Sequence, residues 1–117
     1  MPTIHEVVQA LGTREGVDAV LLLGQDGLVI DSQAGDGVDA DGLAALVPPV
    51  TAACEQLGSA AERGGFGVGL VEYARGMVMV AELTADTLLA VVFAAGANVG
   101  SHLYELKRHR AAIAELL

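Results

Sequence analysis

The chain has 117 residues, which fits one domain over residues 1–117 with a single hydrophobic core. Hydrophobic residues make up 53% and charged residues 18%, a balance that excludes an intrinsically disordered chain. The formal net charge is −9, and residues 1–62 carry ten acidic side chains against one basic side chain, Arg14, which disfavours a nucleic-acid partner.

The sequence also bounds where the protein works. No apolar run approaches the roughly 18 residues of a membrane-spanning helix, and no basic segment of a secretion signal stands at the N-terminus. We therefore expect a cytoplasmic protein without a membrane span. Cys54 is the only cysteine, so no disulfide can form within one chain. Its apolar neighbours predict a buried, inert thiol.

The first third of the chain predicts a helix followed by a hairpin. Residues 3–6 (Thr-Ile-His-Glu) have the pattern of a capping box, and apolar residues recur at helical spacing up to Leu11, before Gly12. Two apolar runs follow, Val17 to Leu23 and Leu28 to Ile30. The Asp-Gly pair between them suits a tight turn, so we expect a β-hairpin.

A second helix is expected to begin at Asp39 or Asp41, whose carboxylates can cap it, and to run toward Glu62. Pro48 and Pro49 fall inside this segment. Because proline lacks an amide hydrogen and clashes with the preceding turn, they predict a kink or a fresh start. The apolar stripe of this helix consists of Leu43, Leu46, Val47, Val50, Cys54, Leu57 and Ala61.

Three strands and a last helix complete the chain. The strands are expected at 66–73, 77–83 and 88–94, and their short connections make them antiparallel neighbours. Residues 88–93 are all apolar, which predicts a central strand with helices over both faces. The helix after Asn98 has an apolar stripe of Val99, Leu103, Leu106, Ile113 and Leu117. The fold class is therefore α/β (α+β), with the order α-ββ-α-βββ-α.

No residue set predicts catalysis, a cofactor or a metal. The glycines of residues 64–69 follow a helix and enter a strand, the reverse of a nucleotide-binding loop. Residues 37–48 begin like a calcium loop but lack carboxylates at its first and twelfth positions. His5, His102 and His109 have no zinc-site spacing and are expected at the surface or its boundary. We therefore predict a protein that is not an enzyme.

Two features are unusual for a monomer. Gly67 and Gly69 alternate with larger residues, which permits close approach of another backbone, either a second copy at a sheet edge or a helix of the same chain. The second helix is rich in alanine, so it can pack closely on a partner helix as well as on its own sheet.

Three segments together resemble the roadblock/dynein light chain family, and specifically its bacterial MglB-like members. They are residues 16–20 (Gly-Val-Asp-Ala-Val), residues 26–30 (Asp-Gly-Leu-Val-Ile) and residues 98–100 (Asn-Val-Gly). The resemblance implies a profilin-like, five-stranded antiparallel sheet in the order 2-1-5-4-3. It places the second helix on one face and the first and third helices on the other.

The resemblance further implies a homodimer that pairs third strands and second helices and binds a Ras-like (MglA-like) small GTPase, modulating its GTPase cycle or localisation. On this basis the GTPase-facing residues are Leu46, Pro49 and Val50. The implied dimer-interface residues are Gly67, Gly69, Val71, Tyr73, Ala53, Leu57 and Ala60. The alternative is a sensory domain of the profilin-like or PAS-like kind, with a small ligand between sheet and helix, although an aromatic content of only 3% disfavours an aromatic-lined pocket.

Overall fold

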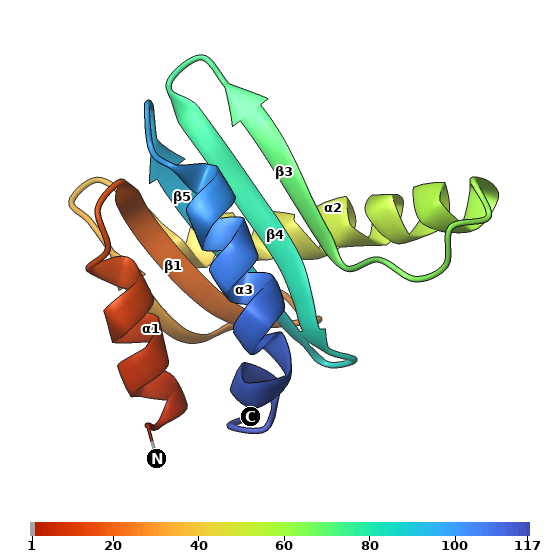
Figure 1. Cartoon of the computed structure of the whole chain (residues 1–117), viewed down its shortest axis with the longest axis horizontal. Helices are drawn as coiled ribbons and strands as arrows, with labels where there is room; N and C mark the ends of the chain where they lie inside the picture. The colour runs from red at the N-terminus through yellow and green to blue at the C-terminus, as the bar shows by residue number, and fades with distance from the viewer. Residues whose placement is uncertain (1) are drawn as a thin grey trace.

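The computed structural model describes residues 2–117, and its helices and strands follow the expected order (Figure 1). The five strands form one antiparallel sheet in the order β2-β1-β5-β4-β3, which confirms the predicted fold class. The elements are α1 (Ile4–Gly12), β1 (Val17–Gly24), β2 (Val29–Ala34), α2 (Ala40–Ala60), β3 (Val68–Tyr73), β4 (Gly76–Thr84), β5 (Thr87–Ala94) and α3 (Val99–Ala114).

The sheet separates two apolar layers. One layer packs side chains of α1 and α3, such as Val8 and Leu106, on one face, and the other packs Ala44 and Val47 of α2 on the opposite face. Strand β5 lies between β1 and β4 and contributes to both layers, because successive strand residues point to opposite faces. The apolar run of residues 88–93 is thus the central strand that the sequence predicts.

Side-chain caps begin the helices at the expected places. The Thr3 hydroxyl accepts from the amide of Glu6, and the Asp39 carboxylate accepts from the amide of Gly42. Each cap satisfies an amide that the first turn of a helix leaves without a partner.

The predicted fresh start at Pro48 is wrong, because α2 runs unbroken from Ala40 to Ala60. The two prolines remove main-chain bonds that a helix would otherwise make. Val47 and Thr51 are nevertheless buried on the sheet, and the Thr51 hydroxyl donates to the carbonyl of Pro48. Because Val47 and Thr51, which flank the two prolines, are buried, the helix continues through Pro48 and Pro49.

Several boundaries differ from the sequence-based expectation. Strand β2 continues to Ala34, and β3 begins at Val68 rather than Phe66. The last helix ends at Ala114, so Leu117 lies beyond it and is exposed. Gly76 opens β4 with φ +148, and a Cβ there would collide with the carbonyl oxygen of Phe93, so only glycine fits this turn.

Candidate interaction surface

The second half of α2 extends beyond the sheet. Figure 1 shows α2 crossing behind the strands and projecting past β3. Its buried residues are Ala44, Val47 and Thr51, and from Ala52 to Ala60 no residue is buried. Cys54 is accordingly half-buried, not buried as predicted, because the helix has left the sheet by this point. About two turns of an apolar helix therefore lack a covering layer.

The exposed side of α2 carries a regular apolar seam. Leu46 is 65% exposed, Val50 42% and Leu57 71%. Together with two exposed alanines they follow the alternating spacing of four and three residues that is typical of helix-to-helix packing. We call this set the α2 seam: Leu46, Val50, Ala53, Leu57 and Ala60. Pro49 lies exposed beside it.

Strand β3 is an edge of the sheet, and its main chain is paired on one side only. The amide of Glu82 donates to the carbonyl of Gly67, and the register places Val68 opposite Ala81. In an antiparallel pair every second residue bonds the neighbouring strand. The amides and carbonyls of Val68, Leu70 and Glu72 consequently point away from the sheet, where an added strand can bond them.

The side chains of β3 divide between the two faces of the sheet. Val71 lies opposite Val78, a residue of the α2 layer, so Val71 and, two residues on, Tyr73 point to the α2 side. Both are exposed. Gly69 has the same orientation. The exposed row of β3 and the projecting half of α2 thus lie on the same side of the sheet.

The two glycines have different surroundings. A Cβ on Gly69 would lie 3.5 Å from the ring of Phe66, an ordinary van der Waals contact, so this ring, which packs on the α2 layer, does not require glycine at residue 69. A Cβ on Gly67 would meet a guanidinium nitrogen of Arg110 in α3 at 3.3 Å. Arg110 in turn donates to the carbonyl of Glu82. Gly67 thus lies under a helix of its own chain.

The projecting half of α2 is tied to the start of β3. The Glu55 carboxylate accepts from the amide of Phe66 at 2.7 Å, and the amide of Arg63 donates to the carbonyl of Gly58 at 2.8 Å. Gly58 leaves room for the returning chain, since a Cβ there would lie 3.0 Å from the carbonyl oxygen of Gly64. These contacts fix the α2 seam relative to the open edge of β3.

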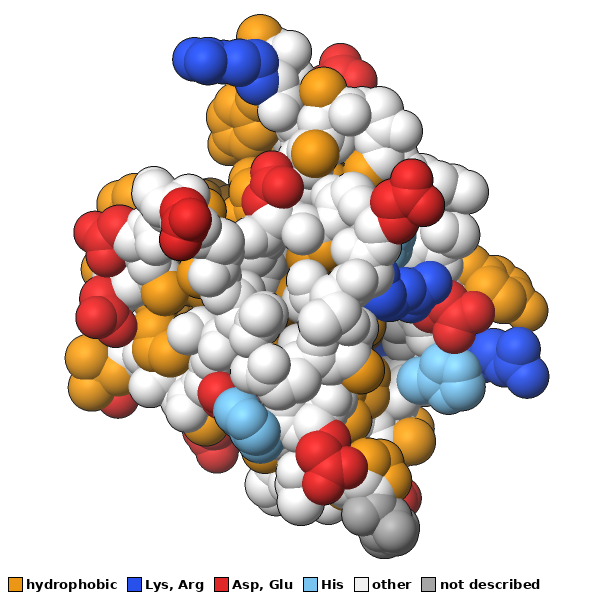
Figure 2. Space-filling view, turned by 90° about the vertical axis from the view of Figure 1, so that its left-hand side faces the viewer, with side chains coloured by type: hydrophobic (Ala, Val, Ile, Leu, Met, Phe, Trp, Pro, Cys, Tyr) orange, Lys and Arg blue, Asp and Glu red, His pale blue; other side chains and the backbone are white. Residues whose placement is uncertain are grey.

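Charge is distributed unevenly over the surface. Figure 2 looks onto the α1 side of the molecule, where acidic side chains are spread widely while Lys and Arg gather toward the top and right of the view. This agrees with the excess of acidic residues in residues 1–62. The pattern disfavours polyanionic partners.

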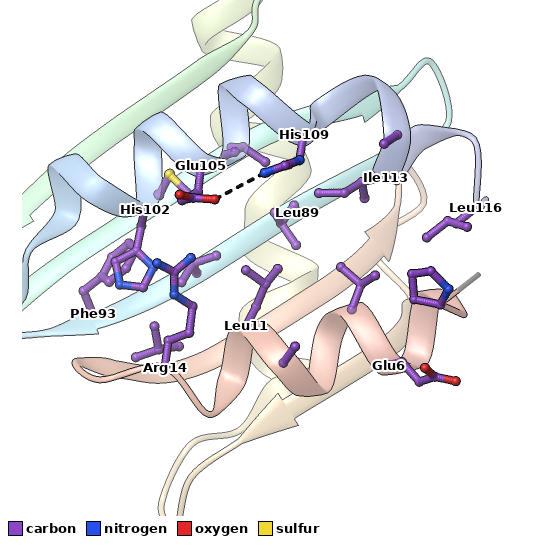
Figure 3. A pocket seen from close by; sticks show the side chains of 18 of the residues that line it. Glu6, Leu11, Arg14, Leu89, Phe93, His102, Glu105, His109, Ile113 and Leu116 are labelled. Carbon is purple, nitrogen blue, oxygen red and sulfur yellow. Dashed lines mark ion pairs between the residues drawn. The ribbon is translucent and has the colours of Figure 1, made fainter.

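The opposite face of the sheet carries a cavity, the feature that the alternative interpretation of the sequence, a small-ligand-binding domain, requires. A cavity of about 590 Å³ lies between α1 and α3, and Figure 3 shows Leu11, Leu89 and Ile113 along its wall. Arg14 and His102 stand together at one end. As the only base in residues 1–62, directly after α1, Arg14 was the one signal that could have drawn attention to this end.

His102 is only 8% exposed, so its predicted placement at the surface or boundary is wrong, whereas His5 and His109 are exposed. Its ring packs on the ring of Phe93 with centroids 4.9 Å apart. Burial and, second, the nearby charge of Arg14 lower the pKa of His102, while a hydrogen bond with the backbone of Glu15 opposes them. His102 is therefore a neutral, packed group at neutral pH.

Other kinds of site have little support in this structure. Among residues 2–117, no group of three or more His, Cys, Asp and Glu side chains is arranged to hold a metal ion. Within the same range, no helix is both long and apolar enough to cross a bilayer.

The architecture defines a class: small three-layer α/β domains whose five-stranded sheet has β2 and β3 at its edges and one helix extending past β3. The model of the Roadblock/LC7 domain matches residues 3–93, and the chain belongs to this family. The matched region spans α1 to most of β5, so α3 lies outside it. The resemblance noted in the sequence is thereby confirmed.

Solved structures support the same fold. The gliding protein MglB from Thermus thermophilus has a TM-score of 0.83 at 25% identity, covering 97% of this chain and 87% of that one. MglB from Myxococcus xanthus has 0.86 at 20% identity, covering 97% and 93%. A Roadblock/LC7 domain from Streptomyces avermitilis has 0.83 at 23% identity, covering 96% and 95%. A comparison with curated proteins gives no match.

Proposed function

We propose that this protein is a non-catalytic, cytoplasmic homodimer that binds a bacterial Ras-like small GTPase and modulates its GTPase cycle or localisation. The observation that carries the proposal is the α2 seam beside the open edge of β3, two uncovered surfaces on the same side of one domain. Membership of the Roadblock/LC7 family and the likeness to MglB structures support it.

A twofold axis gives the geometry of the proposed homodimer. Two copies related by a twofold axis can pair β3 with β3 through the outward groups of Val68, Leu70 and Glu72. The same axis brings the projecting halves of the two α2 helices together, so that Ala53, Leu57 and Ala60 pack against their counterparts. Small side chains at this crossing allow close approach. Gly69, Val71 and Tyr73 form one row along β3, on the side of the sheet that the partner helix covers in this arrangement.

The GTPase is assigned to the other half of the seam. Leu46, Pro49 and Val50 are exposed in the single chain and lie nearer the start of α2. In the proposed dimer they lie away from the crossing and stay exposed. In this arrangement the protein contributes an apolar surface to the GTPase and no nucleotide-binding motif. We therefore assign dimerisation and partner binding to separate ends of one helix.

The test uses three leucines that are similarly exposed in the single chain. Leu57→Asp is expected to raise the dimer dissociation constant at least about tenfold, because a carboxylate would be buried in an apolar contact. Leu46→Asp is expected to keep the dimer and to lose capture of a small GTPase from cytosol loaded with GDP or a GTP analogue. Leu28→Asp, in the β1–β2 hairpin and 67% exposed in wild type, is the control that keeps both. Sedimentation velocity and mass spectrometry of the captured proteins give the readouts.

A wild-type chain that remains monomeric at micromolar concentration would overturn the homodimer. Equal capture by wild type and Leu46→Asp would remove the GTPase from the α2 seam. The cavity between α1 and α3 favours a second function, the binding of a small molecule, which uses neither surface.

A further inference from the structure

We propose that the cavity between α1 and α3 binds a single-chain anionic amphiphile of the fatty-carboxylate class, with its head group on Arg14. This inference does not depend on the GTPase. The cavity lies on the sheet face opposite α2, and its volume of about 590 Å³ is within the range of sites for small organic ligands.

The walls fit a hydrocarbon chain. Leu11 projects from α1, Leu89 and Val91 from the sheet floor, and Leu106 and Ile113 from α3, so apolar side chains surround the cavity on three sides (Figure 3). Burying a methylene group among such side chains contributes roughly 0.8 kcal/mol. A flexible aliphatic chain suits a cavity in which Phe93 is the only aromatic residue other than histidine.

Arg14 supplies the recognition of a head group. Its side chain is half-buried, and among residues 2–117 the structure shows ion pairs only for His5 with Asp31 and for His109 with Glu105. A guanidinium at an apolar wall without a carboxylate partner is poorly solvated. A ligand carboxylate would give it two parallel hydrogen bonds.

The charged groups of the cavity fix the direction of the ligand. Figure 3 shows Arg14 and His102 at one end, with Glu6 and Leu116 at the other. Glu115 also belongs to the lining, and Glu105, drawn beside His102 in Figure 3, is paired with His109 at 3.3 Å. An anionic head is attracted by Arg14 and repelled by Glu6 and Glu115. The chain then extends from Arg14 toward Ile113 and Leu116.

A second, polar hollow gives the head group space. Arg14 and His102 also line a hollow with Gly96, Asn98 and Ser101 at the start of α3, and the exposed Glu15 is the one carboxylate in that lining. The two hollows therefore meet at Arg14. Because His102 is neutral at neutral pH, Arg14 is the only cation shared between them.

The experiment titrates full-length protein with decanoate below its micelle concentration, using calorimetry and methyl NMR. We expect saturable binding with shifts at Leu11, Leu89 and Ile113. Arg14→Gln should weaken the affinity by about tenfold or more, because a charge-assisted pair is lost. Arg75→Gln, in the β3–β4 turn, is the matched control and should bind as wild type does.

A substitution that blocks the cavity and a comparison of ligands with different head groups complete the test. Ala10→Trp places a large side chain at an exposed position of the lining, so it should fold normally and abolish binding. Decanol should bind at least about tenfold more weakly than decanoate, and decyltrimethylammonium should not bind. Absence of saturable decanoate binding, equal binding by Arg14→Gln, or equal affinity for decanol would each overturn the proposal. Leu57→Asp should bind decanoate unchanged, which separates this result from that of the dimer.

Discussion

His102 illustrates how a single side chain can be misread from its neighbours in sequence. It stands in α3 between Ser101 and Leu103, and the helix turns it inward onto Phe93. Its spacing from Val99 and Leu106, three and four residues, places it on the buried stripe of α3. The position of His102 on this stripe can be recognised from sequence. Its proximity to Arg14 cannot, because Arg14 belongs to a distant segment of the chain.

Burial of His102 has a consequence for stability. Its pKa in the folded protein lies below the ordinary value of 6.5, so the unfolded chain binds more protons as the pH falls through this region. The free energy of unfolding should therefore decrease as the pH is lowered below about 6.5, and His102 should have no effect above it. In urea denaturation, the free energy of unfolding should fall more from neutral to mildly acidic pH for wild type than for His102→Gln. An equal fall in both proteins would contradict this prediction.

At the scale of elements, the spacing of apolar residues predicted which segments are helices and which are strands. Each helix buries one apolar stripe on the sheet, and strand residues alternate between its two faces. The course of α2 through Pro48 and Pro49 was not predictable from local rules, since it depends on the packing of Val47 on strands distant in sequence and on the burial of Thr51. The start of β3 likewise depends on the long-range bond between Glu55 and Phe66.

The sequence singled out the apolar residues of α2 but did not separate its two faces. Leu46, Val50 and Leu57 were placed on one stripe with Val47, whereas the structure buries Val47 on the sheet and leaves the other three exposed. The direction of Gly67 did not follow from the alternation of strand residues, because Gly67 precedes β3 and lies against Arg110.

The edge of β3 gives a prediction at this scale. Leu70→Pro removes an amide that points away from the sheet, so the single chain should stay folded while the dimer dissociation constant rises at least about tenfold. Val71→Pro removes an amide that bonds β4 and should cost about 3 kcal/mol of folding free energy. Leu70→Ala separates loss of the side chain from loss of the amide and should keep the dimer. Sedimentation and urea denaturation measure both effects, and an unchanged dimer in Leu70→Pro would exclude pairing through this edge.

At the scale of the whole molecule, the two faces of the sheet differ in how far helices cover them. Helices α1 and α3 cover one face and leave a cavity between them, whereas α2 covers part of the other face and extends past β3. The proposed dimer completes the second face by supplying the missing layer. Folding and association should therefore be coupled.

This coupling predicts a melting temperature that depends on protein concentration. If the dimer is the stable form, each tenfold increase in wild-type concentration should stabilise it by up to about 1.4 kcal/mol. Leu57→Asp should show a smaller dependence of melting temperature on concentration than wild type, because its dimer is weaker, while Leu28→Asp should follow wild type. Differential scanning calorimetry over a hundredfold concentration range checks this, and a constant wild-type melting temperature would argue against an obligate pair.

The two edge strands of the sheet differ in composition, and we expect this difference to limit the growth of the sheet by strand pairing. Strand β2, at the far margin, carries Asp31, Ser32 and Gln33, and Asp31 is held by His5 of α1 at 2.8 Å. Polar and charged residues of this kind disfavour the addition of a strand at β2, whereas the edge of β3 is open to it. Once two β3 strands have paired about a twofold axis, the edges that remain are the two β2 strands. The sheet can therefore double without growing into a fibre.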